Sequence, residues 1–107
     1  MRYGDFRWDS TKAAANVRKH GVTFEEAASV FLDDLAVPYA DAMNEDRLIL
    51  IGMSLRSNLL LVVFAERRSG EVIRIISARR ATQRERRAYE EGDQAPTTQR
   101  GVAPRVS

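Results

Sequence analysis

The sequence that decides the fold reads LLLVVFAE from Leu59 to Glu66. Its first six residues are apolar without alternation, and such a run predicts a strand that is buried on both faces at the centre of a sheet. A turn at 67–70 separates this run from VIRIISAR, which spans Val72 to Arg79. Because so short a connection cannot cross over to a parallel neighbour, the two segments are expected to form an antiparallel hairpin.

The second segment of this hairpin combines a core pattern with a charged position. Alternation along a strand places on one face Ile73, Ile75 and Ser77, and on the other face Val72, Arg74, Ile76 and Ala78. One face is therefore expected to be core, whereas the other presents an arginine at its middle. Strand propensity favours an aliphatic or β-branched residue at position 74, so a guanidinium there indicates a face that meets a ligand.

The residues before this hairpin extend it into a larger sheet. Apolar segments at 36–40 and 47–53 predict two more strands, and the polar breakers between the segments are typical of short turns. Together with strands at 59–66 and 72–79 they form an antiparallel meander. Alternation at 6–8 predicts a further short strand near the N-terminus.

Helix signals lie on both sides of the meander. Asp9 or Ser10 can cap a helix over 11–20, and Thr23 opens a capping box for a second helix that ends at 33–34. A second capping box, which begins at Thr82, predicts a third helix as far as residue 91.

The order of these elements predicts the fold class and the domain. A strand, two helices, a meander and a helix indicate an α+β fold whose helices are segregated from an antiparallel sheet. Residues 1–92 are expected to form this single domain. Residues 93–107 have little apolar content and are expected to form a flexible tail.

The composition excludes several kinds of site. The 107 residues contain no cysteine and one histidine, so disulfides, thiolate metal sites and a cysteine nucleophile are excluded. The acidic pairs at 25–26 and 33–34 are sequence neighbours, which do not face the same point on a helix, and we expect no metal and no other cofactor. No apolar run reaches the ~20 residues of a membrane span, and no secretory signal follows Met1. We therefore expect a cytoplasmic protein that does not engage a membrane.

Positive charge is concentrated in the second half of the chain. The segment from Arg67 to Arg87 contains eight arginines, two glutamates and no lysine, although the net charge of the whole chain is only +2. Such a local field attracts polyanions, and a guanidinium can grip a phosphate through two hydrogen bonds. The alternative is a solvated face that reflects coding bias, and charge alone leaves both interpretations open.

The same segment contains groups that could cleave RNA without a metal. Cleavage needs help in deprotonating the 2′-hydroxyl, positive charge on the phosphorane and a proton for the leaving 5′-oxygen. Glu66 is a candidate base, and positive charge could come from Arg67 or Arg68, from Arg74 and from Arg79. Glu66 and Arg74 are expected to lie near one another across the hairpin. A simple cross-strand ion pair, and an Arg79-Arg80 segment that only leads into the third helix, remain as alternatives.

Lysine and histidine at the end of the first helix also allow two interpretations. Lys19 could hold phosphate and His20 could move protons. Cationic side chains also favour a helix C-terminus, and Gly21 would then simply end the helix. Similarly, Trp8 and Tyr89 could stack on bases, although each is more often a core anchor.

At this point the residues resemble a known family, the BrnT-type toxins. The resemblance covers roughly residues 6–91 in three ordered blocks. The first block contains Trp8-Asp9, Lys12, Asn16, Lys19-His20-Gly21-Val22 and Phe24-Glu25-Glu26-Ala27. The second contains Val30-Phe31-Leu32-Asp33, Arg47, Ile51-Gly52-Met53-Ser54 and Leu61-Val62-Val63. The third contains Ile73-Arg74-Ile75-Ile76-Ser77-Ala78-Arg79, Ala81-Thr82, Glu85-Arg86 and Tyr89.

The resemblance implies a RelE-like fold and an endoribonuclease that needs no metal. It implies that Glu66, Arg67, Arg74 and Arg79 form the active face, with Lys19 and His20 on its fringe as RNA-binding positions. Arg68 and Arg80, which adjoin these arginines in the sequence, are also expected to bind RNA. It also implies a type II toxin–antitoxin system, in which a BrnA-like antitoxin with a ribbon-helix-helix DNA-binding domain neutralises the toxin and assembles it into an oligomer. One departure is Ala65, where family members commonly carry threonine.

Two other functions fit the charge pattern. The chain could be a module that binds nucleic acid or a regulator without cutting, or an interaction protein whose arginines meet an acidic partner. An arginine-rich face satisfies the carboxylates of an antitoxin about as well as it satisfies the phosphates of RNA. Growth arrest and RNA cleavage by the chain alone would separate a nuclease from these alternatives.

Overall fold

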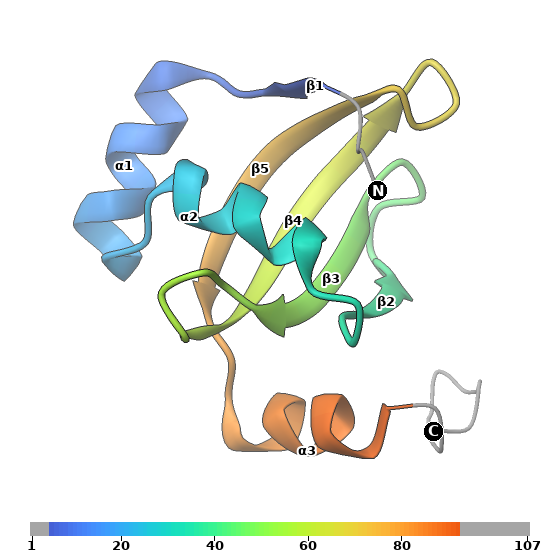
Figure 1. Ribbon diagram of the computed structural model, residues 1–107. Helices are drawn as coiled ribbons and strands as arrows, with labels where there is room; N and C mark the ends of the chain where they lie inside the picture. The colour runs from blue at the N-terminus through green and yellow to red at the C-terminus, as the bar shows by residue number, and fades with distance from the viewer. Residues whose placement is uncertain (1–4, 93–107) are drawn as a thin grey trace.

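The computed structural model describes residues 5–92, and these residues form a five-stranded sheet with two helices across one side (Figure 1). The strand order is β1-β5-β4-β3-β2, so the apolar run at 59–64 lies in the central strand as predicted. The predicted antiparallel meander is confirmed for β2 to β5, while β1 pairs parallel to β5. The strands span Asp5–Arg7 (β1), Val37–Ala40 (β2), Leu48–Met53 (β3), Leu59–Arg67 (β4) and Val72–Arg80 (β5). The tail expected at 93–107 lies outside the described residues.

The predicted helix caps are formed at the first helix, α1 (Ser10–His20). The Asp9 side chain accepts hydrogen bonds from the backbone N–H groups of Thr11 (2.8 Å) and Lys12 (3.0 Å), which lowers the pKa of Asp9. Gly21 ends the helix with φ 70°, a left-handed conformation that glycine adopts without strain.

The second predicted helix is shorter than expected. α2 (Phe24–Ser29) is followed by a 3₁₀ turn, η1 (Val30–Leu32), instead of continuing to 33–34. The Ser29 hydroxyl donates to the carbonyl of Glu26 at 2.6 Å, and such side-chain competition for helix carbonyls favours a tightened end.

The Glu26 carboxylate joins α2 to the β3–β4 turn instead of completing the capping box at Thr23. It accepts hydrogen bonds from the Ser54 hydroxyl (2.7 Å) and the Asn58 amide (2.8 Å). Thr23 still caps α2, because its hydroxyl accepts from the N–H of Glu26 at 3.0 Å. The polar side chains at this turn therefore hold α2 against the sheet.

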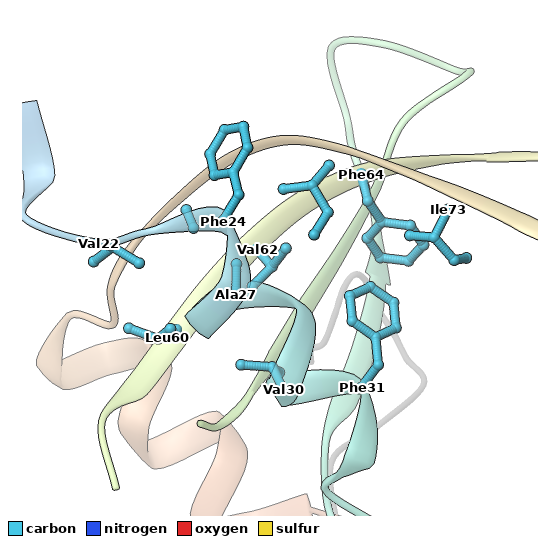
Figure 2. Packing of buried hydrophobic residues seen from close by; sticks show 11 residues of the cluster. Val22, Phe24, Ala27, Val30, Phe31, Leu60, Val62, Phe64 and Ile73 are labelled. Atoms are coloured by element: carbon cyan, nitrogen blue, oxygen red, sulfur yellow. The ribbon is translucent and has the colours of Figure 1, made fainter. Parts of the chain in front are cut away.

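The main core lies between the sheet and α2, on what we call the helix face (Figure 2). Alternate residues of β4 point into it, and Phe31 packs edge-on against Phe64 with ring centroids 4.9 Å apart. Trp8 packs edge-on against Phe24 at the rim of the same cluster, which makes it a core anchor. The largest fully buried side chains of this cluster are Val22, Phe24, Val30, Leu60, Val62 and Ile75.

The opposite side of the sheet, which we call the open face, carries a smaller apolar cluster. Ile51, Leu59 and Leu61 are buried there, at the end of the sheet next to α3 (Gln83–Glu91). Farther along, Tyr39, Ile49 and Val63 are only half-buried. In Figure 1, α3 lies beyond one end of the sheet, so it covers only part of the open face.

The predicted alternation of β5 is wrong after Ile75, because the strand contains a bulge at Ile76. Phe64 of β4 is paired with Ile75 and Val63 with Ser77, so Ile76 is an extra residue without a partner. The side chains after the bulge therefore change faces. Ala78 joins Ile73 and Ile75 in the core of the helix face, and Ser77 lies on the open face.

The buried amide of Asn16 fixes the backbone just after this bulge. It donates to the carbonyls of Ala78 (2.8 Å) and Val22 (2.9 Å) and accepts from the N–H of Ala78 (3.2 Å). β1 pairs only with residues 72–74, so the amide takes the place of a neighbouring strand beside residue 78. All three of these hydrogen bonds of the Asn16 amide are buried.

We expect Asn16→Ala to lower the free energy of unfolding by about 2–4 kcal/mol, because it leaves the polar backbone atoms of Ala78 and Val22 without partners. Urea denaturation followed by circular dichroism measures the change. Asn44→Ala is the matched control, because Asn44 is exposed in a turn and its removal should change stability by less than about 0.5 kcal/mol. If the two variants lost the same free energy of unfolding, the hydrogen bonds of Asn16 would not stabilise the fold.

Candidate functional site

The register of the β4–β5 hairpin places two of the predicted arginines on the open face. Arg74 is paired with Ala65, and Arg67 is paired with Val72 two residues away along β5. Residues 61, 63 and 65 of β4 belong to the open face, so Arg67 and Arg74 are diagonal neighbours there. Arg67 is exposed and Arg74 is half-buried.

The bulge brings a third predicted arginine to the same face. Arg79 is paired with Leu61, whose side chain belongs to the cluster on the open face. Without the extra residue, positions 74 and 79 would have opposite parity and would point to opposite faces. Their partners Ala65 and Leu61 are four residues apart on β4, so at about 3.3 Å per residue the Cα atoms of Arg74 and Arg79 are roughly 13 Å apart. Ser77 lies between them on the same face. Bulges commonly re-aim side chains in this way next to functional sites.

Glu66 does not join this group, which corrects the prediction that it lies beside Arg74. Glu66 is paired with Ile73, a core residue of the helix face, whereas Arg74 points to the open face. Its carboxylate instead lies near the turn, with one oxygen 3.8 Å from the position that a Cβ of Gly70 would occupy. The short distance across the turn predicted that the two residues lie together, but their side chains point to opposite faces of the sheet because successive residues of a strand alternate.

Arg79 is held by the carboxylate of Glu85, the residue that completes the capping box begun at Thr82. Its Nη1 and Nη2 atoms each donate to Glu85 at 2.9 Å, with 38% of the Arg79 side chain and 21% of the Glu85 side chain exposed. Glu85 also accepts from the N–H of Thr82 at 2.8 Å. Burial would raise the pKa of Glu85, but the hydrogen bonds from Arg79 and Thr82 outweigh it and hold this pKa below its ordinary value.

The predicted RNA-binding residues lie in three different places. Lys19 and His20 are in the last turn of α1, which packs against β5. Arg68 is exposed in the β4–β5 turn with φ 55°. Arg80 belongs to the helix face and donates to the Asn58 side chain at 3.0 Å. Arg68 follows Arg67 and Arg80 follows Arg79 in the sequence, but the Arg80 side chain belongs to the other face of the sheet.

The position of α3, and with it the Glu85 carboxylate, depends on a second polar contact. The Tyr89 hydroxyl donates to Asp33 at 2.8 Å, and the same carboxylate accepts from the N–H groups of Met53 (2.8 Å) and Leu35 (2.9 Å). Burial and the bond to Asp33 raise the pKa of Tyr89 to about 12. Tyr89 is therefore engaged in holding α3. Asp33 and Tyr89 appeared in the sequence analysis, but no local pattern predicted their pairing.

A hollow of about 390 Å³ lies between the start of β2 and the end of α3, but its charge is wrong for RNA. Its lining includes Asp34, Glu90 and Glu91 around the apolar side chains of Leu35 and Pro38. Carboxylates repel phosphate, so the open face is the better candidate for RNA. Among residues 5–92, no three histidine or acidic side chains gather as metal ligands would, and no helix there is long and apolar enough to cross a membrane.

The comparisons with known proteins agree with each other. Residues 8–85 match the family described as ribonuclease toxin, BrnT, of type II toxin–antitoxin systems. The fold is similar to the crystal structure of the ribonuclease toxin BrnT from Brucella abortus, with a TM-score of 0.62 and 30% sequence identity over 75% of this chain and 99% of that chain. No curated protein sequence matches. The predicted fold and the predicted resemblance are thereby confirmed, and the chain belongs to the BrnT family of ribonuclease toxins of type II toxin–antitoxin systems.

Proposed function

We propose that this toxin is a metal-independent endoribonuclease that binds and cleaves RNA on the open face of its sheet. The observation that carries the proposal is the bulge in β5, which places Arg79 on the same face as Arg67 and Arg74. Half-buried Val63 lies beside Ser77 between Arg74 and Arg79, and half-buried Ile49 and Tyr39 continue the open face across β3 and β2. A face with cationic and apolar parts fits both the phosphates and the bases of a single strand.

The reaction requires positive charge more than any other feature. The 2′-oxygen of one nucleotide attacks the adjacent phosphorus, the bond to the 5′-oxygen breaks, and the products are a 2′,3′-cyclic phosphate and a 5′-hydroxyl. Charge accumulates on the non-bridging oxygens in the transition state, and fixed guanidinium donors stabilise it there. In this proposal Arg74 and Arg79 are the catalytic residues and Arg67 assists them. In this proposal the 2′-hydroxyl gives its proton to water and the 5′-oxygen takes a proton from water, because Glu66, the predicted base, points to the other face.

The Glu85 carboxylate acts in this proposal as a positioning residue for Arg79. A guanidinium carries five N–H donors, and among the described residues Arg79 uses three, two toward Glu85 and one toward the carbonyl of Arg80. The remaining two donors can bind a phosphate while Glu85 keeps the side chain in one orientation. An oriented donor group loses little freedom when the substrate binds.

We expect Arg74→Ala and Arg79→Ala each to reduce the rate of RNA cleavage about 10²–10³-fold, because each removes a charge partner of the transition state. Lysine at either position should restore activity only in part, since it lacks the two-pronged geometry. Cleavage of a defined RNA measures the rate, growth arrest measures toxicity, and circular dichroism confirms folding.

Glu66→Gln provides the contrast, because it alters a charged residue of the same hairpin on the other face. We expect it to keep cleavage within about tenfold of the wild-type rate, whereas loss of a general base typically costs 10²–10⁴-fold. A loss of that size would show that Glu66 acts as the general base after all. If Arg74→Ala and Arg79→Ala both fold and cleave RNA at the wild-type rate, the catalytic site lies elsewhere. If the wild-type chain binds RNA but does not cleave it, the chain is a non-catalytic binding module.

Metal independence has a direct test. Because the proposed chemistry uses guanidinium groups of the chain, cleavage of the defined RNA should continue at an unchanged rate in excess EDTA. A metal-dependent nuclease assayed in the same buffer is the control for chelation. If EDTA abolishes cleavage and Mg²⁺ or Mn²⁺ restores it, a metal ion takes the role that we assign to the arginines.

Membership of a type II system implies an antitoxin, and we propose a BrnA-like protein with a ribbon-helix-helix DNA-binding domain that acts in the cytoplasm. Its inhibitory segment would cover the open face and place acidic groups against the arginines. Oligomers of the toxin would then form through the antitoxin, because ribbon-helix-helix domains are dimers.

Co-expression of the product of a neighbouring gene should relieve growth arrest through a tight complex. In that complex Arg67, Arg74 and Arg79 should lose reactivity toward phenylglyoxal, as read by mass spectrometry, because the partner shields them. Arg56 is exposed in the β3–β4 turn and should stay reactive, which makes it the internal control. A complex in which the three arginines remain as reactive as Arg56 would mean that inhibition works through another surface.

A further inference from the structure

The parallel pairing of β1 brings an arginine that sequence analysis did not consider to the side of Arg74. Arg7 is the direct partner of Arg74 in the register, and Phe6 is the partner of Ile73. Phe6 packs into the helix face, edge-on against Phe31 with ring centroids 5.2 Å apart. Because successive side chains alternate, Arg7 points to the open face, on a strand about 4.8 Å from that of Arg74.

This pair is electrostatically unfavourable in the free protein. Like charges directly across two strands are destabilising, and Arg67 adds a third guanidinium diagonal to Arg74. The Asp5 carboxylate lies 3.5 Å from Arg7, but the two side chains are 62% and 60% exposed, and so exposed an ion pair compensates weakly. Asp9, which caps α1, also attracts Arg74 electrostatically, but it is exposed and its carboxylate is engaged by the backbone of the helix. Three arginines from three adjacent strands are therefore balanced by only two nearby carboxylates, both exposed.

The fold itself does not require an arginine at position 7. The burial of Phe6 and the hydrogen bond from the N–H of Asp5 to the carbonyl of Glu71 (2.8 Å) hold β1 in place. A β-branched residue would suit the strand better at this position. The matched family segment begins at residue 8, so the family match does not account for Arg7.

We propose that Arg7 and Arg74 form a clamp for one phosphate of single-stranded RNA. The proposal rests on the proposed function and extends the open face by a residue outside the matched family segment. A phosphodiester offers two non-bridging oxygens, and guanidinium groups on both sides can hydrogen-bond them while the phosphate charge relieves their repulsion. The clamped phosphate is the scissile phosphate of the proposed function, which Arg79 approaches from the other end of the open face. The Asp5 carboxylate competes with this phosphate for Arg7.

The test is the binding of a short, mixed-sequence 2′-O-methyl RNA, which lacks the attacking hydroxyl and stays uncut. Fluorescence anisotropy is measured between about 50 and 200 mM salt. Arg7→Ala should weaken binding about three- to tenfold and reduce the slope of log Kd against log salt by about 0.7, the value for one phosphate contact on a single strand. Arg7→Lys should keep the slope, since the charge remains. Asp5→Asn should tighten binding.

The controls separate this proposal from the function on which it rests. Arg56→Ala removes an exposed arginine at the other end of β4 and should leave binding unchanged. If Arg74→Ala weakens binding while Arg7→Ala and Asp5→Asn bind like the wild type, the Arg7–Arg74 clamp is wrong, but the open face is still the RNA-binding surface. If neither Arg74→Ala nor Arg7→Ala has an effect, the open face itself is not the RNA surface. If Arg56→Ala weakens binding as much as Arg7→Ala, net charge explains the effect and the clamp is wrong.

Discussion

The hydrogen bonds between Asn16 and Ala78 are the interaction on which the rest of the structure depends. A bulge leaves the ladder of a strand locally unpaired, and the backbone next to it must find other partners because buried N–H and C=O groups cannot remain unsatisfied. The Asn16 amide supplies a donor and an acceptor to Ala78 and also binds the carbonyl of Val22. One side chain thereby joins α1, β5 and the start of α2, and it fixes the register shift that decides where Arg79 points.

Arg79 depends on α3 for its orientation, and α3 in turn depends on polar contacts. No residue of α3 is buried, so the apolar area that it covers cannot hold it strongly. The Arg79–Glu85 pair and the Tyr89–Asp33 hydrogen bond fasten its first and last turns. The Asp33 carboxylate also accepts from the N–H of Met53 in β3, next to Gly52. A Cβ at Gly52 would lie 2.8 Å from that of Ala36, so only glycine allows this close approach.

The sequence was sufficient to predict the helices and strands, but it was not sufficient to predict the face of the sheet on which each side chain of β4 and β5 lies. Caps at Asp9 and Thr82 and the apolar run at 59–64 act locally, so the helices, the central strand and the fold class could be predicted from short patterns. The bulge at Ile76 leaves no local signal, because the hydrogen bonds that hold the backbone beside it join Ala78 to Asn16, 62 residues away in the sequence. One extra residue reversed the predicted faces of Ser77 and Ala78. The error for Glu66 has a different origin, since spacing across a turn does not determine the face on which a side chain lies.

Arginines on the open face conflict with the stability of the sheet, and this conflict favours a ligand of opposite charge. Arg7, Arg67 and Arg74 repel each other in the free protein, and each could be replaced by a residue that suits a strand better. Bound phosphate would relieve the repulsion, and so would the carboxylates of an acidic partner, because both present oxygen atoms to the same N–H donors. Two ligands that satisfy one set of donors must compete for it. A toxin that recognises RNA through arginine is therefore open to inhibition by an acidic partner, and the partner needs no separate site to exclude the substrate.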